Sequence, residues 1–219
     1  MNIQFVISDN QIYVLEVNPR ASRTVPVISK ITGIPMAQLA SKLVLGKTLQ
    51  EVTSEKGLLP DLPYYTLKFP VFSTYKLLGD PTVGPEMKST GEGISIAETI
   101  DEALTKVFHS YIISKKSADE IVLDTDSVPE EIKQLASELG VKMYVSNDIS
   151  DWCKSEKALA FVSLSGDKNA KKNKLEASQK RVHVFTEIET LHAFLKALRV
   201  SDFSVMSIQE RRSKFIKQK

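Results

Sequence analysis

Hydrophobic and polar residues alternate at the start of the chain, and this alternation predicts an antiparallel pair of β-strands. We expect strands at residues 2–7 and 12–17, joined by turn-forming residues at 8–11. Successive side chains of a strand point to opposite faces. One face of the second strand is therefore expected to carry Ile12, Val14, Glu16 and Asn18.

The length of the turn decides which residue of the second strand lies opposite Gln4. A two-residue turn pairs Gln4 with Leu15, whereas a three-residue loop pairs it with Glu16. In the second register, the side chains of Gln4, Glu16 and Asn18 form one oxygen-rich patch.

Such a patch suits a hard divalent cation. Magnesium prefers oxygen ligands in octahedral geometry, keeps several waters and is usually shared with substrate phosphates. Arg20 follows shortly after the strand and is suited to hold a phosphoryl group. Spacing alone favours a plainer interpretation, in which the polar side chains at a strand end simply face solvent.

The remainder of the first half is expected to form helices and then an irregular stretch. Pro35 and Gly46 suit the start and the end of the second of these helices. Residues 47–92 are rich in Pro and Gly and contain one or two extended segments. The helices are expected at 25–32, 35–45 and 95–108.

The pattern changes in the second half, where short apolar runs alternate with amphipathic segments. Strands are expected at 120–124, 141–145, 158–164 and 181–185, and helical segments at 129–139, 150–156 and 187–199. Alternation of this kind predicts an α/β fold with a parallel sheet covered on both faces. We therefore divide the chain into residues 1–111 and 112–219, with a basic tail from residue 201.

Composition narrows the classes of partner. The chain has 219 residues and a formal net charge of +2, which is ordinary for a globular protein. So small a charge provides no field that would draw the whole chain to nucleic acid or to a membrane. Basic residues cluster at 168–181 and 211–219, which we interpret as solvated faces. No run approaches the roughly 20 apolar residues of a membrane span, so we expect a cytoplasmic protein.

Two reactive side chains are interpreted as structural. Cys153 is the only cysteine, which excludes an internal disulfide and fits a reducing compartment. It lies beside Trp152 without a matching histidine motif, so we expect a buried thiol. His183 is flanked by Val182 and Val184 and is expected to be a structural histidine within a strand.

Two stretches resemble the large subunit of carbamoyl phosphate synthetase. MNIQFVISDNQIYVLEVNPRASRTVPVISKITGIP, residues 1–35, is similar to the end of its second ATP-grasp unit. DPTVGPEMKSTGE, residues 80–92, is similar to the segment that links this unit to a regulatory domain. Residues 112–219 take the place of the methylglyoxal-synthase-like allosteric domain, a match that rests on the order of elements and on the ending SVMSIQE. The resemblance implies a partial ATP-grasp segment of α+β type followed by a small parallel-sheet α/β domain.

The resemblance also implies a role for the oxygen-rich patch. In this family the matching glutamine, glutamate and asparagine bind the magnesium or manganese ions that bridge the phosphates of ATP. By that correspondence Gln4, Glu16 and Asn18 are metal ligands, with Gln4 and Glu16 also assigned to cofactor binding, and the three-residue loop is the expected turn. Arg20 matches an arginine associated with the transferred phosphate, and Arg23 matches a second basic position near it.

The implied reaction is that of an ATP-dependent ligase, which makes carbamoyl phosphate from bicarbonate, ammonia and ATP. The second ATP-grasp unit is implied to phosphorylate carbamate, and a small glutaminase subunit to supply the ammonia. Met1 opens directly into a strand, so we expect a fragment that acts with the remainder of the large subunit and is inactive alone. An incomplete sheet is expected to leave apolar edges that favour homo-oligomers.

Two interpretations of residues 112–219 stay open. Regulatory domains of this family bind small phosphorylated effectors such as UMP or IMP at the carboxyl ends of the parallel strands. An effector site here would use Ser163, Ser165, Gly166, Lys168 and Thr186. Alternatively the domain is a degenerate structural or subunit-contact element, because YVSNDISDW lacks the Thr-x-Gly-Thr-like turn typical of the family. Arginine and pyrimidine supply stay open as alternative pathways.

Overall fold

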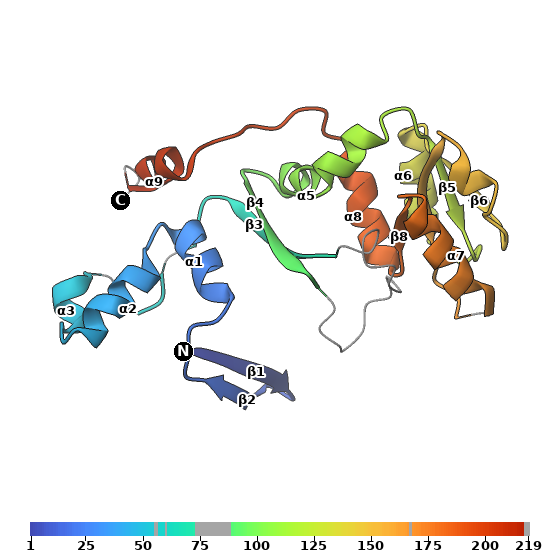
Figure 1. Ribbon diagram of the computed structural model, residues 1–219. Coiled ribbons are helices and arrows are strands. Elements are labelled where there is room, and N and C mark those ends of the chain that lie inside the picture. The colour runs from blue at the N-terminus through green and yellow to red at the C-terminus, as the bar shows by residue number, and fades with distance from the viewer. Residues whose placement is uncertain (55–56, 60, 73–88, 167, 217–219) are drawn as a thin grey trace. The chain divides into compact units, whose positions relative to one another are not determined.

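The computed structural model divides into two compact units, which are described separately (Figure 1). Unit 1 comprises Met1–Pro63 and Val205–Lys219, and unit 2 comprises Tyr64–Ser204. The structure describes residues 1–54, 57–59, 61–72, 89–166 and 168–216. The predicted link at 80–92 therefore lies outside the described residues, except for its last four positions. None of the helices in the described part of the chain is long and apolar enough to cross a membrane.

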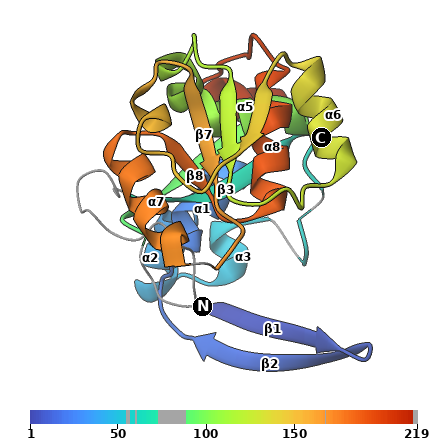
Figure 2. The same cartoon turned by 90° about the vertical axis from the view of Figure 1, so that its right-hand side faces the viewer.

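Unit 1 begins with an antiparallel hairpin of β1 (Asn2–Ser8) and β2 (Gln11–Asn18) (Figure 2). Its turn has two residues, Asp9 with φ 48° and Asn10 with φ 63°. Positive φ at both positions defines a type I′ turn, whose twist matches that of the strands and which Asn and Asp tolerate well. The predicted three-residue loop is therefore wrong.

Gln4 nevertheless lies opposite Glu16, because a β-bulge corrects the register within the hairpin. Phe5 pairs with Val14, but the residue before it, Gln4, pairs with Glu16. Leu15 is therefore the extra residue of β2. A bulge places two residues of one strand opposite one residue of its partner. The predicted pairing is present, and the bulge rather than the turn produces it.

The bulge also sorts the side chains of the hairpin by polarity. Paired residues share a face of the sheet, and successive residues alternate between faces. One face consequently carries only apolar residues, namely Ile3, Phe5, Ile7, Ile12, Val14 and Val17. The prediction that Ile12 and Val14 share a face with Glu16 is wrong, since the extra residue moves them to the opposite face. An unbroken register would have mixed polar and apolar side chains on both faces.

Three helices follow the hairpin in unit 1. They are α1 (Thr24–Thr32), α2 (Met36–Val44) and α3 (Leu49–Val52). Helix α1 ends where Gly33 takes the left-handed conformation, with φ 72°. The first two helices confirm the prediction. The third was not predicted, although Thr48 and Glu51 form a reciprocal capping box at its start, with Thr48 N donating to Glu51 Oε2 at 2.7 Å.

The expected tail contains a further helix, α9 (Ile208–Ile216). Ser207 and Glu210 cap its first turn reciprocally. The Ser207 N–H donates to Glu210 Oε2 at 2.8 Å, and the Glu210 N–H donates to Ser207 Oγ at 3.1 Å. This Ser-x-x-Glu spacing is the sequence signature of a helix start, and the helix that it begins was not predicted within the basic tail.

Unit 2 opens with an antiparallel pair of strands and a long helix. The elements are β3 (Tyr65–Val71), β4 (Gly91–Ala97) and α5 (Ile100–Ser114). The helix predicted from residue 95 begins only at Ile100, where Thr99 Oγ1 accepts the Glu102 N–H at 3.2 Å and caps it. The predicted division between residues 111 and 112 falls inside α5, so the structure places that division within a continuous helix.

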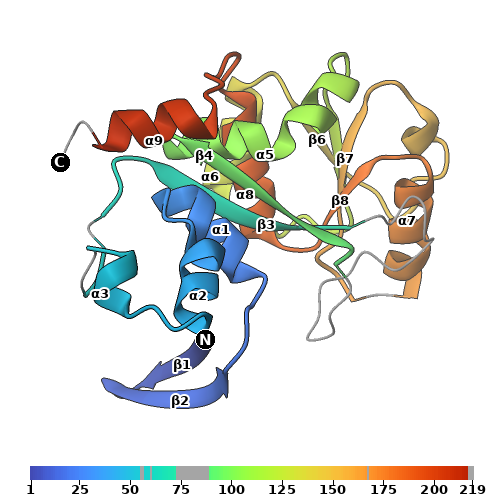
Figure 3. The ribbon, with the colours of Figure 1, turned by 60° about the vertical axis from the view of Figure 1, so that its left-hand side comes forward.

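A parallel sheet of four strands forms the centre of unit 2, in the order β6-β5-β7-β8. Figure 3 labels three of these strands, β6, β7 and β8. The strands are β5 (Glu120–Leu123), β6 (Lys142–Val145), β7 (Ala158–Val162) and β8 (His183–Phe185). The helices are α6 (Glu130–Glu138), α7 (Lys168–Gln179) and α8 (Ile188–Leu198), with the 3₁₀ turn η1 at Trp152–Lys154. The predicted α/β class and parallel sheet are confirmed. Helix α7 was missed, because its many lysines suggested only a solvated run.

Two hydrophobic clusters cover the two faces of this sheet. On one face, Ile121 and Leu123 pack with buried residues of α6 and α8 and with one side of α5. On the other face, Val122 packs with η1 and α7, and Cys153 there is 3% exposed. Alternate strand residues thus enter different clusters, as a sheet covered on both faces requires. The expectation of a buried Cys153 is confirmed.

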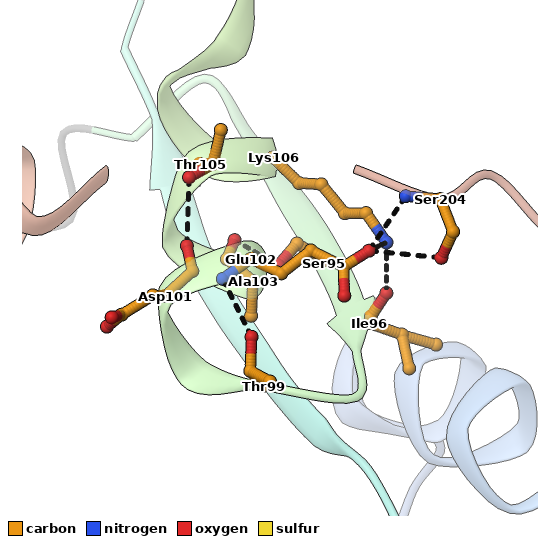
Figure 4. Close-up of polar contacts among 9 residues, drawn as sticks. All are labelled: Ser95, Ile96, Thr99, Asp101, Glu102, Ala103, Thr105, Lys106 and Ser204. Atoms are coloured by element: carbon orange, nitrogen blue, oxygen red, sulfur yellow. Dashed lines mark hydrogen bonds and ion pairs between the residues drawn. The ribbon is translucent and has the colours of Figure 1, made fainter. Parts of the chain in front are cut away.

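Polar side chains of α5 fix this helix to β4 and to the segment after α8 (Figure 4). Lys106 Nζ donates to the carbonyl of Ile96 at 2.8 Å and pairs with Glu102 at 3.1 Å. Ser204 donates its backbone N–H and its hydroxyl to Glu102 Oε1, at 2.9 and 3.1 Å. Burial acts to raise the pKa of Glu102, but these hydrogen bonds and Lys106 outweigh it and lower that pKa. The contacts hold Ser204 against α5.

His183 lies in an aromatic cluster at the start of β8. Its ring stacks on Phe194 with 6.4 Å between ring centroids, and Tyr111 and Phe185 lie at 4.7 and 4.8 Å. Burial lowers the pKa of His183 from 6.5 to about 4. The expectation of a structural strand histidine is confirmed by this packing.

The lowered pKa makes the stability of unit 2 depend on pH. The unfolded chain binds a proton at His183 more readily than the folded chain does. The contribution of neutral His183 to the stability of unit 2 is therefore complete above pH 6.5 and is lost as the pH falls toward 4. We expect the free energy of unfolding to drop by about 3 kcal/mol between pH 7 and pH 4 from this residue. Urea denaturation of the wild type and of His183→Phe at both pH values isolates the effect. Equal pH dependence in the two proteins would contradict it.

Candidate metal and phosphate site

The polar face of the hairpin brings together the three predicted metal ligands. Gln4 of β1 is paired with Glu16 of β2. Asn18, two residues further along β2, donates its Nδ2 to Glu16 Oε1 at 2.8 Å. Gln4 and Glu16 are exposed, and Asn18 is half-buried. Within the described part of this chain, no other residue covers the side chains of Gln4 and Glu16.

The chemistry of these side chains fits a hard divalent cation. A carboxylate and two amide oxygens are ligands that Mg²⁺ accepts, and an open site leaves room for waters and phosphate oxygens. In the described ranges, no three His, Cys, Asp or Glu residues lie together as a metal site. The oxygen-rich patch offers one carboxylate, Glu16, together with the amides of Gln4 and Asn18. Rotation of the Asn18 amide exchanges its nitrogen for its oxygen and completes the oxygen set.

The two predicted phosphate-binding arginines lie between β2 and α1. Arg20 is exposed, and its Nη1 donates to the carbonyl of Ala21 at 3.2 Å. Arg23 is also exposed and occupies the residue before the first turn of α1, with φ −59°. Both guanidinium groups are thus on the connection that directly follows the oxygen-rich patch.

The predicted effector turn in unit 2 is arranged around a residue that sequence reasoning missed. Asp124 follows β5 directly, and its carboxylate reaches the turn after the neighbouring strand β7. Oδ2 accepts the Ser163 and Ser165 hydroxyls, each at 2.8 Å. Oδ1 accepts the backbone N–H groups of Leu164 at 2.9 Å and of Ser165 at 3.1 Å. Parallel strands end at one edge of a sheet, so an aspartate as the last residue of the strand predicted at 120–124 was the available signal.

The other predicted effector residues lie at the same edge. Gly166 is exposed, and a Cβ atom at that position would meet nothing within 4 Å, so no close contact requires glycine there. Lys168 is the first residue of α7, and Thr186 directly follows β8 and is half-buried. The structure thus gathers Ser163 and Ser165 on Asp124 and places Thr186 at the end of the adjacent strand.

The hairpin lies in a segment whose sequence matches a known protein family. Residues 1–52 match the family described as carbamoyl-phosphate synthase L chain, ATP binding domain. The carbamoyl phosphate synthase arginine-specific large chain of Geobacillus stearothermophilus is 49% identical over 211 residues, which are 95% of this chain and 20% of the relative. The chain is homologous to one part of the carbamoyl phosphate synthase large chain.

Two further large chains support this homology. The arginine-specific large chain of Bacillus subtilis is 41% identical over 90% of this chain and 18% of its own length. That of Halalkalibacterium halodurans is 37% identical over 92% of this chain and 20% of its own length. The chain therefore spans about a fifth of the carbamoyl phosphate synthase large chains that it matches. The family resemblance drawn from the sequence is confirmed, and the match to the ATP-binding domain contains the whole hairpin.

Proposed function

We propose that this chain is the C-terminal part of a carbamoyl phosphate synthase large chain, and that residues 1–111 complete the ATP-grasp unit that phosphorylates carbamate. The observation that carries the proposal is the pairing of Gln4 with Glu16, beside Asn18, within the segment that matches the ATP-binding domain. Three oxygen-bearing side chains lie on one sheet face in a region of matching sequence, which supports the proposal.

Gln4, Glu16 and Asn18 would hold Mg²⁺ or Mn²⁺ at this face. The bound ion supplies positive charge to the phosphates of ATP and to the phosphoryl group in transfer. The three side chains bring only one negative charge, because the two amides are neutral. A divalent ion held by them keeps a net positive charge, which favours phosphate oxygens at its remaining positions.

Arg20 and Arg23 would bind the transferred phosphoryl group. Both are exposed on one short connection, so neither guanidinium is buried away from a ligand. A guanidinium offers paired N–H donors that match phosphate oxygens, and its charge persists at any working pH. These residues would orient the phosphoryl group and stabilise its negative charge during transfer.

The complete enzyme would combine bicarbonate, ammonia and ATP into carbamoyl phosphate. A small glutaminase subunit would provide ammonia from glutamine, and the remainder of the large chain would provide the other ATP contacts. The chain spans about a fifth of its relatives, so we propose that it has no turnover alone. The arginine-specific names of the three relatives support arginine supply over pyrimidine supply.

Residues 112–219 would form the methylglyoxal-synthase-like domain. The four-stranded parallel sheet supports that assignment. The domain would act either as a module that binds a phosphorylated effector or as a structural element that binds none. The contacts of Asp124 with Ser163 and Ser165 favour the structural function at this turn.

Kinetics of the full-length large chain with its partner subunit test the metal site. In Gln4→Ala we expect carbamoyl phosphate formation to fall by about 10-fold to 100-fold, because the cation loses one oxygen ligand. Bicarbonate-dependent ATP hydrolysis, which the other ATP-grasp unit would perform, is expected to persist. Gln11→Ala, at the turn end of the same hairpin, is the matched control. Equal loss of both activities in Gln4→Ala, or loss of neither, would contradict the proposal.

A further inference from the structure

Asp124 and the turn after β7 form a closed set of hydrogen bonds at the carboxyl edge of the sheet. The Asp124 residue is 8% exposed, and Ser163 is 5% exposed. The carboxylate accepts two hydroxyl groups and two consecutive backbone N–H groups. Both of its oxygens are therefore committed to the turn, and the donors of the turn are directed at Asp124.

These donors are of the kind that binds a phosphate. Consecutive backbone N–H groups with serine hydroxyls form concave anion sites, and hydrogen bonds to a charged acceptor are stronger than neutral ones. In this chain the anion is a side chain of the protein. A phosphate entering the turn would have to displace the carboxylate, or share its donors while facing a second negative charge in a poorly solvated place.

The position of Asp124 in the sheet keeps the carboxylate in place. Its own N–H donates to the Val162 carbonyl of β7 at 3.0 Å, and the Ser163 N–H donates to the Phe185 carbonyl of β8 at 2.8 Å. Both residues are thus anchored by backbone hydrogen bonds between neighbouring parallel strands. The Asp124 side chain thus links the end of β5 to the end of β7.

We propose that Asp124 is a built-in anion that fills the anion-binding turn of unit 2 and determines that this turn takes no phosphorylated ligand. The inference concerns unit 2 alone and does not depend on the metal site proposed for unit 1. Asp124 thereby occupies the hydrogen-bond donors that a phosphate would need. Unit 2 is then insensitive to the concentration of a phosphorylated ligand at this turn.

Titration of the chain with inorganic phosphate tests the proposal, with NaCl at matched ionic strength as the reference. The readouts are the amide NMR signals of Leu164 and Ser165 and the melting temperature. In the wild type we expect neither to respond specifically to phosphate. In Asp124→Ala we expect saturable shifts of both amide signals and at least about tenfold tighter phosphate binding, with a melting temperature that rises with phosphate. Asp126→Ala, which removes an equal charge from an exposed position two residues away, should behave as the wild type.

Two results of this titration would overturn the proposal directly. Saturable phosphate binding at Leu164 and Ser165 in the wild type would overturn the proposal, and so would a folded Asp124→Ala protein that binds no phosphate. Should Asp124→Ala unfold unit 2, phosphate is expected to restore the folded NMR spectrum, because a ligand that binds only the folded state favours folding. Failure of phosphate to restore it, while the Asp126→Ala protein stays folded, would equally overturn the proposal.

Discussion

Replacing Glu16 with alanine in the full-length large chain is expected to reduce the rate of carbamoyl phosphate formation by at least about 10³-fold, or about 4 kcal/mol of transition-state stabilisation. Glu16 is the one carboxylate of the oxygen-rich patch, where it pairs with Gln4 and accepts a hydrogen bond from Asn18. Its removal leaves two neutral amides, which bind a divalent cation weakly. The loss should therefore exceed that caused by removing either amide.

Conservative variants separate charge from shape at this position. Glu16→Gln keeps an oxygen ligand but removes the charge, so most of the activity should still be lost, with partial recovery at high Mn²⁺ concentration. Gln11→Ala, on the same strand, should retain wild-type rates. A Glu16→Ala enzyme within tenfold of the wild type at ordinary Mg²⁺ concentration would refute the assignment of Glu16.

The largest effect on stability is expected for Phe194→Ala in unit 2. Phe194 is fully buried on α8, and its ring lies 5.2 Å from both Phe108 and Phe185 between ring centroids. Truncation removes the buried ring and leaves a cavity among aromatic side chains, so the free energy of unfolding should fall by about 3–5 kcal/mol. Urea denaturation measures the change.

Ile113→Ala is the matched control for this substitution. Ile113 lies on α5 in the same unit and is 60% exposed, so its truncation should cost less than about 1 kcal/mol. If the two variants lost equal stability, the aromatic cluster around Phe194 would not be the centre of the core.

The parallel sheet could be predicted because its strands carry continuous apolar runs. All five residues of β7 are buried, and such a strand is typical of a sheet covered on both faces. Helix α7 shows the limit of the same reasoning. Its apolar stripe consists of small residues such as Ala170 and Ala177, and the lysines around them conceal the helical period.

The register of the hairpin could be predicted only in part. The pairing of Gln4 with Glu16 was predicted from the family resemblance, together with a three-residue loop as its cause. The structure instead combines a two-residue turn with a bulge at Leu15. Side-chain alternation within one strand does not reveal a bulge, because the extra residue is defined only by the partner strand. Comparing the apolar positions of both strands under each register would have indicated it.

The contacts of Asp124 could not be read from local sequence. Asp124 and Ser163 are 39 residues apart and meet because β5 and β7 are neighbours in the sheet. Sequence order alone does not fix strand order, since β6 lies between them in the chain. Taken without Asp124, the serines and glycine of the turn therefore resemble an anion-binding site.

The hairpin is proposed to supply the metal ligands of carbamate phosphorylation. Anomalous diffraction from crystals of the full-length large chain with Mn²⁺ and a non-hydrolysable ATP analogue tests it most directly. We expect a manganese peak about 2.1 Å from oxygen atoms of Glu16 and of at least one of Gln4 and Asn18, shared with phosphate oxygens of the analogue. Manganese bound to the phosphates of this ATP-grasp unit with none of these three side chains as a ligand would contradict it.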